Sequence, residues 1–442
     1  MNVANRRRCP LLTLACAVLV AGAGNSAMGQ GAIPSSDQRA PPNGYYLGGS
    51  QGFVHDSNVY RIPDGQSDNY SLTSLLAGFD QSVGRQRVFG LADVHVSRYQ
   101  HQTELDNTGY SLLAGVDGST VHNLSGAIST SLSQTLAAPA ANGVVPVATQ
   151  EQARLRSVNG RIRWGEELPI MIESRLGYSK VSYSSPAYAA SNFDGDLASL
   201  GVFYQPGGRL RIGVAARFDR TRTPETSVDA ITGATQSNTV RGSSLDLLAG
   251  YTISSVLSTA ARVSYTHQSN SNDALNAADF SGFTGGLDVD YQATGKIGVK
   301  LFAARAANLN APLLNGGNGV GVAQPGASLP AAGGTVTSNG LQQTNQLTDS
   351  IGLRLVYRAT SKITATTGLG YARARLVATA SNPSSDQGRD TQKTAYLGAN
   401  WNITRAVGLD CRLARETRNV SGTAPYSYGD TTVGCAARLT LR

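Results

Sequence analysis

Asp93, His95 and Ser97 come closest to a catalytic set, because an acid, an imidazole and a hydroxyl occur at alternate positions. These residue types are the ones that hydrolases use to activate a serine. In an extended strand, however, residues two apart stand about 7 Å from each other, which is too far for direct proton transfer. We therefore expect no catalytic relay here and predict that the protein is not an enzyme.

The other residues of ligand type show no recognisable spacing either. The longest Gly-rich stretch, 311–345, does not match the Gly-x-Gly-x-x-Gly spacing and opens no helix, so it predicts no phosphate site. We expect it to be an outer loop that either folds into the mouth of the fold or stays mobile outside it. The five histidines lack the spacing of metal ligands, and no metal or cofactor is predicted: His55, His95, His101, His122 and His267.

The N-terminus has the composition of a secretory signal peptide. Three consecutive arginines precede a short apolar run, 11–24, and small residues lead to a cleavage position near Gln30. A membrane anchor would need about 20 apolar residues, and lipoprotein processing at Cys16 would truncate the apolar run. We therefore expect an exported outer-membrane protein with a signal peptide, a periplasmic segment and a barrel at 1–29, 30–43 and 44–442.

Charge and composition exclude nucleic-acid binding. Loss of the three signal-peptide arginines, with no acidic residue removed, lowers the formal net charge from +8 to +5. The rest of the chain has no Lys/Arg run. Glycine is abundant at 50 residues, and few windows show the 3.6-residue apolar period of amphipathic helices. The composition therefore favours strands.

The pattern of connections predicts a barrel. Short polar breaks alternate with long irregular stretches, and Leu210, Ile212 and Val214 share one face while Arg209 and Arg211 share the other. Strands of a soluble sandwich also alternate, but they usually run five or six residues and their connections are not sorted by length. Membrane barrels need strands of about 9–11 residues, short periplasmic turns and long extracellular loops. We predict an all-β, transmembrane antiparallel β-barrel of about 18 strands (16–18).

Aromatic residues mark two levels on the predicted apolar face. One set directly precedes the short turns: Phe79, Trp164, Tyr204, Tyr251, Tyr291, Tyr357 and Trp401. The second set follows the turns by about eight residues, or roughly 20 Å along the barrel axis: Tyr178, Phe218, Tyr265 and Tyr371. Two such belts are typical of the two lipid interfaces. Cross-strand packing in a soluble core is the alternative.

Closure would turn the polar face into a lumen. Unpaired backbone groups in hydrocarbon cost several kcal/mol each, so the first strand, about 44–54, must pair with the last, about 432–442. Barrels of this size leave an aqueous channel. The main lumen candidates are Arg211, Arg217, Asp288, Asp290, Lys300, Arg354, Arg358 and Arg412, and others are Asp93, His95, Glu173, Arg175, Asp246, Asp410 and Arg438. Each is also interpretable as an ion-paired wall residue.

Two cysteines remain after the signal peptide, and both are expected on the lipid face. Cys411 shares its face with Leu409 and Leu413, and Cys435 lies on the last strand. A hairpin centred near residue 423 would oppose the two at about 4.5–5.5 Å between Cα atoms, within disulfide range. The oxidising periplasm would permit a bridge. Two small apolar residues facing lipid are the open alternative.

Residues 44–136 resemble the outer-membrane β-barrel porins of exopolysaccharide biosynthesis operons, the EpsL type. The matching phrases are "HDSNVYRIPDG", with Asp56, Asn58, Val59, Tyr60 and Arg61, then "VGRQR", "SRYQ" and "LDNTGYSLLAGV". The resemblance implies a barrel that serves exopolysaccharide biosynthesis or export. Its implied partners are outer-membrane lipid, the polysaccharide and periplasmic export components.

Three functions fit this sequence. The first is an outer-membrane channel for exopolysaccharide, the second is a general diffusion porin for small polar solutes, and the third is a structural barrel without transport. All three need the same shell of strands, so the sequence does not separate them.

Overall fold

The computed structural model describes residues 44–136, 151–186, 189, 192–228, 235–253, 256–271, 279–307, 346–376, 388–422 and 427–441. The expected signal peptide (1–29), the N-terminal segment (30–43) and the stretch 311–345 lie outside the described residues.

Eighteen long strands and two short 3-10 helices make up most of the described chain. The helices are η2 (Thr103–Leu105) and η4 (Pro206–Gly208). The strands are β1 (Gly44–Asp56), β2 (Asp68–Val83), β3 (Gln86–Tyr99), β4 (Asn107–Ser119), β5 (Leu124–Leu136), β6 (Gln152–Trp164), β7 (Ile170–Tyr183), β8 (Phe193–Tyr204), β9 (Leu210–Val228), β10 (Thr235–Ile253), β11 (Leu257–Asn270), β12 (Phe280–Gln292), β13 (Ile297–Ala307), β14 (Gln346–Arg358), β15 (Ile363–Leu376), β16 (Gly388–Asn402), β17 (Val407–Gly422) and β18 (Tyr428–Leu441).

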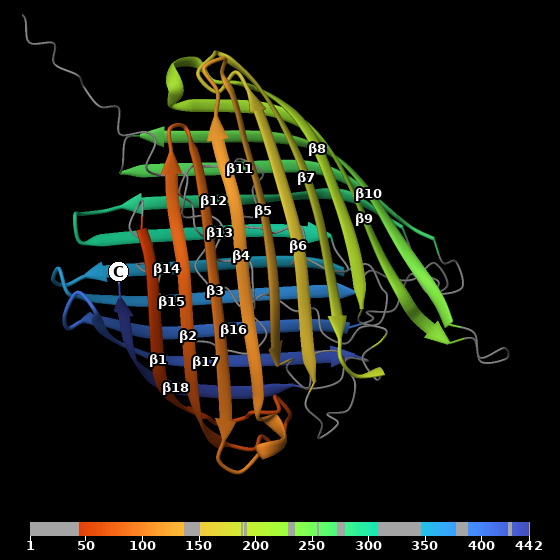
Figure 1. Cartoon of the computed structure of the whole chain (residues 1–442). Coiled ribbons are helices and arrows are strands. Elements are labelled where there is room, and N and C mark those ends of the chain that lie inside the picture. Colours follow the sequence, from red (N-terminus) through yellow and green to blue (C-terminus); the bar gives the residue numbers. More distant parts are fainter. Residues whose placement is uncertain are drawn as a thin grey trace, which may run out of the picture.

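The strands form one closed antiparallel barrel. Each strand pairs with its neighbours in the chain, and β1 also pairs with β18 from Leu47↔Leu441 to Asp56↔Thr432. Figure 1 shows the red-to-yellow strands crossing in front of the green-to-blue ones, as opposite walls of the barrel. The predicted strand number and the pairing of first and last strands are confirmed, since no strand edge is left open.

The connections sort by length onto the two ends of the barrel. Two residues join β2 to β3 and four join β16 to β17, whereas 57–67 and 308–345 join strands at the other end. Because the strands are antiparallel, the connections of five residues or fewer lie at one end, here called the short-turn end, except for 423–427 between β17 and β18. The other is the long-loop end.

Strand β2 runs further than the apolar alternation predicts. The sequence places its end at Phe79, but pairing with β3 continues to Val83↔Gln86. A two-residue turn is possible there because Gly84 adopts a φ of 63°, a left-handed conformation that glycine reaches without steric cost. Three of the four missed residues are polar, so the pattern of apolar residues alone could not reveal them.

The outer surface of the barrel carries the expected aromatic residues. All but Phe79 of the two predicted sets are exposed, including Trp164, Tyr204 and Phe218. Phe79 is half-buried because its ring lies 6.4 Å from that of Tyr45, measured between centroids. Aliphatic side chains are exposed between the two aromatic levels, for example Leu369 at 59%. An exposed apolar band between aromatic belts is the surface that lipid favours.

The two larger buried apolar clusters of the described residues lie on the inner face. At the short-turn end, Met171, Phe203 and Leu248 pack together across β7, β8 and β10. At the long-loop end, Tyr70 and Tyr99 stack at 4.7 Å between centroids, within a cluster that also includes Val59, Tyr60, Leu105 and Leu136. These clusters line parts of the wall and leave polar residues between them.

Leu369→Arg should impair folding far more than Thr366→Arg on the same strand. Leu369 points outward at mid-strand, where an arginine facing hydrocarbon costs about 2–4 kcal/mol. Thr366 lies on the opposite face of β15. The free energy of unfolding in lipid vesicles is the measurement, and equal losses in both variants would mean that the faces are assigned wrongly.

Candidate functional site

The lumen is the candidate site, and strand alternation positions its side chains. On β9, the outward side chains of Ile212 and Val214 are 43% and 50% exposed, whereas the inward side chain of Arg217 is 9% exposed. Because side chains of a strand alternate between two faces, one strand supplies both the apolar outer surface and the polar inner wall. The same alternation recurs on β14 and β17.

Two ion pairs join predicted lumen residues across neighbouring strands. The Arg217 guanidinium lies 3.2 Å from the Asp246 carboxylate of β10. The Lys300 ammonium lies 2.7 Å from Asp290 of the neighbouring strand β12, and Asp288 follows two residues earlier on the same face. These pairs neutralise part of the charge along the wall.

Arg354 and Arg412 flank an aromatic ring on the neighbouring part of the inner face, across β14–β17. The Arg412 guanidinium lies over the Tyr396 ring, 4.6 Å from its centroid. The ring lies flat along the wall because Gly368 of β15 has no side chain, and a Cβ there would approach the ring to 2.1 Å. Arg354 forms no ion pair with a described carboxylate. The ring itself is buried, so the two half-buried guanidinium groups are the part of this cluster that can bind anionic or hydroxyl-rich groups.

The remaining predicted residues lie near the short-turn end. Arg211 is half-buried on the lumen face of β9. Arg358 is the last residue of β14 and is exposed at the rim, so it contributes to the entrance rather than to the inner wall. Arg438 approaches Asp410 at 3.6 Å between nitrogen and oxygen.

The sequence analysis missed three arginines on the lumen face. Arg161 and Arg163 of β6 and Arg262 of β11 share the lumen face with the predicted arginines. Arg163 and Arg175 each lie 2.5 Å from the buried carboxylate of Glu173. The outward positions of Ile162 and Trp164 could have revealed the two β6 arginines, because residues between outward positions must point inward.

The lumen is polarised from one wall to another. Among the described side chains, the inner face of β6–β11 carries six arginines, here called the basic wall, against three carboxylates: Arg161, Arg163, Arg175, Arg211, Arg217 and Arg262 against Glu173, Asp219 and Asp246. The inner face of β1–β4 is acidic, with Arg87 the cation among Asp56, Asp68, Asp80, Asp93 and Asp117. Separated charges of this kind set up a field across a water-filled pore.

The sequence argument against an Asp93–His95 contact is wrong in its geometry. His95 Nδ1 lies 3.0 Å from an Asp93 carboxylate oxygen, because both side chains lean along the strand. The imidazole has room to do so since Gly109 on β4 has no side chain beside it. Ser97 is fully buried and its hydroxyl has no hydrogen-bond partner, so it does not complete a relay with His95.

The residues of the phrase "HDSNVYRIPDG" lie at the long-loop end and connect β1 to β18, the two strands that close the barrel. Arg61, in the connection after β1, lies 3.2 Å from Asp56 and 3.1 Å from Asp430 of β18. Ser57 donates a hydrogen bond from its hydroxyl to Asp430, and Asn58 donates one from its side chain to the Gly429 carbonyl. Burial alone would lower the pKa of Arg61, but the two carboxylates raise it above its usual value, so the guanidinium stays charged.

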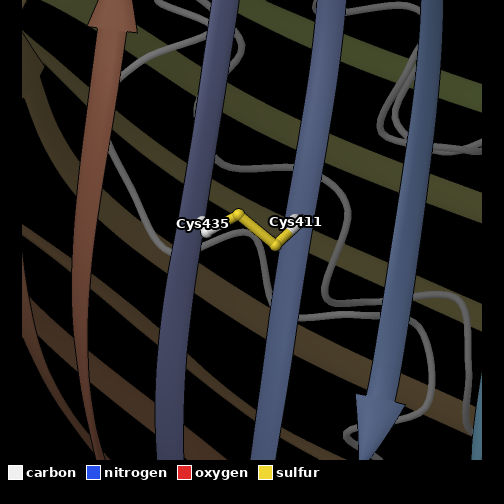
Figure 2. The surroundings of a disulfide bond; sticks show 2 residues. All are labelled: Cys411 and Cys435. Atoms are coloured by element: carbon white, nitrogen blue, oxygen red, sulfur yellow. A yellow bond between two sulfur atoms is a disulfide. The ribbon is translucent and has the colours of Figure 1, made fainter.

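Cys411 and Cys435 are joined by a disulfide in the structure. They oppose each other directly on β17 and β18, with Cα atoms 4.1 Å apart. Figure 2 shows the bridge linking the two neighbouring strands. Leu413 and Val433 beside it are 45% exposed on the outer surface, so the bridge also faces outward. Its position therefore restrains the last hairpin and leaves the lumen unchanged.

Other kinds of site are not apparent in the described part of the chain. No group of three His, Cys, Asp or Glu side chains among the described residues is placed to hold a metal ion. Within the same residues, no helix has the length and hydropathy needed to cross a membrane.

Comparison with known proteins finds similar structures but no matching family. No family model and no curated protein sequence matches the chain. The outer-membrane protein OpdK of Pseudomonas aeruginosa, also solved with vanillate, is 11% identical, with a TM-score of 0.46 over 90% of this chain and 99% of that one. OccK2 (OpdF) of the same organism has a TM-score of 0.47 at 11% identity, covering 90% and 97% of the two chains. A bacterial polysaccharide outer-membrane secretin has a TM-score of 0.36 at 11% identity, covering 91% and 100%.

Purified protein should yield a linked Cys411–Cys435 peptide when it is alkylated and digested without reduction. The two residues are direct cross-strand neighbours, which favours the bridge. Mass spectrometry identifies the linked peptide. Recovery of both residues as alkylated thiols would show that the last hairpin carries no disulfide.

Replacing Arg354 and Arg412 by glutamine should shift ion selectivity toward cations. Both side chains lie on the lumen wall, and removing their charge lowers the local anion concentration. The zero-current potential of the barrel in a planar bilayer, under a KCl gradient, measures this change. Lys296→Gln with Lys362→Gln, at exposed short turns, is the matched control. Absence of any conductance in the unmodified protein would show that the lumen is blocked.

Proposed function

We propose that the protein is an outer-membrane channel through which an exopolysaccharide leaves the cell. The observation that carries this proposal is the contrast between the two faces of one closed sheet. The outer face is apolar and aromatic, which suits lipid, while the inner face is charged and hydroxyl-bearing along its length. Barrels of 16–18 strands can enclose an aqueous channel.

The inner wall offers suitable contacts for a sugar polymer. Arg354 and Arg412 lie half-buried beside the buried Tyr396 ring, and guanidinium groups suit the hydroxyl groups and acidic substituents of sugars. The basic wall on β6–β11 adds cations that are held in place by Glu173 and Asp246. Repeated weak contacts on a hydrated wall suit a long polar chain that must keep moving.

The resemblance of residues 44–136 to exopolysaccharide-operon barrels supports the polymer as cargo. The distinctive residues of that resemblance, Asp56, Asn58 and Arg61, lie at the seam between β1 and β18. They support the architecture of the barrel rather than a sugar contact. The choice of a polysaccharide over a small solute therefore depends on the resemblance together with the lumen chemistry, and the experiment must separate the two.

Deletion of the gene should lower surface polysaccharide while total polymer synthesis continues. Polymer made inside the cell would have no path through the outer membrane, so the ratio of surface to total polysaccharide should fall. Complementation with the unmodified gene should restore the ratio. Unchanged surface polysaccharide in the deletion strain would contradict the proposal and leave a diffusion porin or a structural barrel.

Replacing Arg211, Arg354 and Arg412 by glutamine should then lower export of an acidic polymer several-fold without lowering barrel abundance. Each arginine is on the lumen wall, and the substitutions remove charge but keep hydrogen-bonding groups. A control removes three cations outside the lumen, at Lys296, Lys362 and Arg405 in the short turns. Equal export by both variants would argue against guidance of the polymer by lumen charge.

A further inference from the structure

A second cluster of cations lies on the outside of the barrel, near the long-loop end. Six basic side chains on β6, β7, β9 and β10 point outward and are exposed, and they are here called the outer cation cluster: Arg154, Arg156, Lys180, Arg220, Arg222 and Arg241. None of the six forms an ion pair with a described residue. The proposed channel makes no use of them, because they face away from the lumen.

Strand register gathers these side chains into two adjoining rows. In the row nearer the long-loop end, here called the upper row, Arg156 pairs with Lys180, Lys180 with Asp194, and Asp194 with Arg222. In the row below, Asp196 pairs with Arg220, which pairs with Arg241. Figure 1 shows β6–β10 side by side in the same wall. Asp194 and Asp196 are the carboxylates in these rows, so the cluster keeps a net positive charge.

An apolar groove lies directly below the cations, toward the middle of the strands. Its volume is about 680 Å³, and Arg220 and Arg241 are part of its upper edge. Small residues make its floor, since Gly160 and Ala198 occupy outward positions between larger neighbours. Its sides include Ile128, Leu176, Tyr178 and Phe218, all of them outward and exposed.

The vertical order of these features corresponds to the order of groups in a lipid. Tyr178 and Phe218 belong to the aromatic level nearest the long loops, which marks the outer lipid interface. The cations lie just beyond that level, at headgroup depth, and the groove lies on the hydrocarbon side. Basic side chains at a membrane surface attract anionic headgroups, with each contributing about 1 kcal/mol.

We propose that the outer cation cluster and its groove bind a phosphorylated lipid of the outer leaflet, with phosphate on the cations and an acyl chain along the groove. This inference rests on the outer-membrane position that the proposed function requires, but it does not depend on the cargo. Phosphate fits because arginine binds it in a bidentate manner and lysine binds it as a point charge. An acyl chain fits the groove because its floor has no side chain at Gly160.

Native mass spectrometry of the purified barrel in detergent, titrated with bisphosphorylated hexa-acylated lipid A, tests this proposal. The unmodified protein should bind lipid A, and Arg156→Gln/Lys180→Gln/Arg220→Gln/Arg241→Gln should bind it at least tenfold more weakly. A matched control removes four cations from the short turns, at Arg209, Lys296, Lys362 and Arg405, and should keep the original affinity. Equal losses in both variants would show attraction by net charge alone and would overturn the proposal.

Gly160→Phe provides a second variant that retains every charge. The nearest atom to a Cβ at this position is the Leu176 carbonyl oxygen at 4.0 Å, so the ring can occupy the groove without clashing with the barrel. Its affinity for lipid A should also fall several-fold, and unchanged affinity would overturn the role of the groove. Inorganic phosphate and phosphatidylethanolamine are the comparison probes, and competition by phosphate alone at the same concentration would reduce the site to an anion site.

Export separates this proposal from the proposed function. The four-glutamine variant of the outer cation cluster should export polysaccharide at the original level while binding lipid A weakly. Heat-modifiable mobility on gels shows that each variant is folded. Intact lipid A binding together with unchanged surface polysaccharide in the deletion strain would contradict only the lumen proposal. Absent lipid A binding together with lowered surface polysaccharide in the deletion strain would contradict only the lipid site.

Discussion

The structure depends on one constraint, which is that no strand may leave its backbone unpaired. An exposed N–H or C=O group in hydrocarbon costs several kcal/mol, so a single sheet can face lipid only when its first strand meets its last. The pairing of β1 with β18 meets this requirement from Leu47 to Asp56. Arg61 reinforces the seam by contacting both strands through Asp56 and Asp430, and the Cys411–Cys435 bridge holds the adjacent hairpin. Lumen, lipid face and loops all follow from this closure.

In a closed barrel each strand has one face toward lipid and one toward the lumen. A simple alternation of apolar and polar residues is therefore enough to predict the fold. Ile212 and Val214 are outward and Arg211 and Arg217 inward because neighbouring residues must point to opposite faces. Charged side chains on the inner face form ion pairs between neighbouring strands, as Arg217 and Asp246 do. The basic wall and the acidic wall then create a polarised interior, while the outer cation cluster extends the same principle to the lipid surface.

Strand number, face assignment and both aromatic levels could be predicted because each depends on local alternation. The turn at Gly84 could not, since the residues around it are polar and only backbone pairing extends β2 to Val83. The Asp93–His95 contact was missed because strand spacing fixes Cα positions but not the lean of side chains, and that lean depends on the space left by Gly109. The clustering of Arg220 with Arg241 depends on register between β9 and β10, which no single strand encodes.

Site-directed spin labelling along β9 in outer-membrane vesicles tests the two-faced barrel most directly. Labels placed one at a time from position 211 to position 218 report access to oxygen, which concentrates in lipid, and to a nickel complex, which stays in water. A closed membrane barrel predicts oxygen maxima at Ile212, Val214, Ala216 and Phe218, and nickel access at the inward positions Arg211 and Arg217, which lie outside the buried apolar cluster of this wall. Absence of a two-residue period, or nickel access on the outward positions, would contradict a barrel that separates lipid from an aqueous lumen.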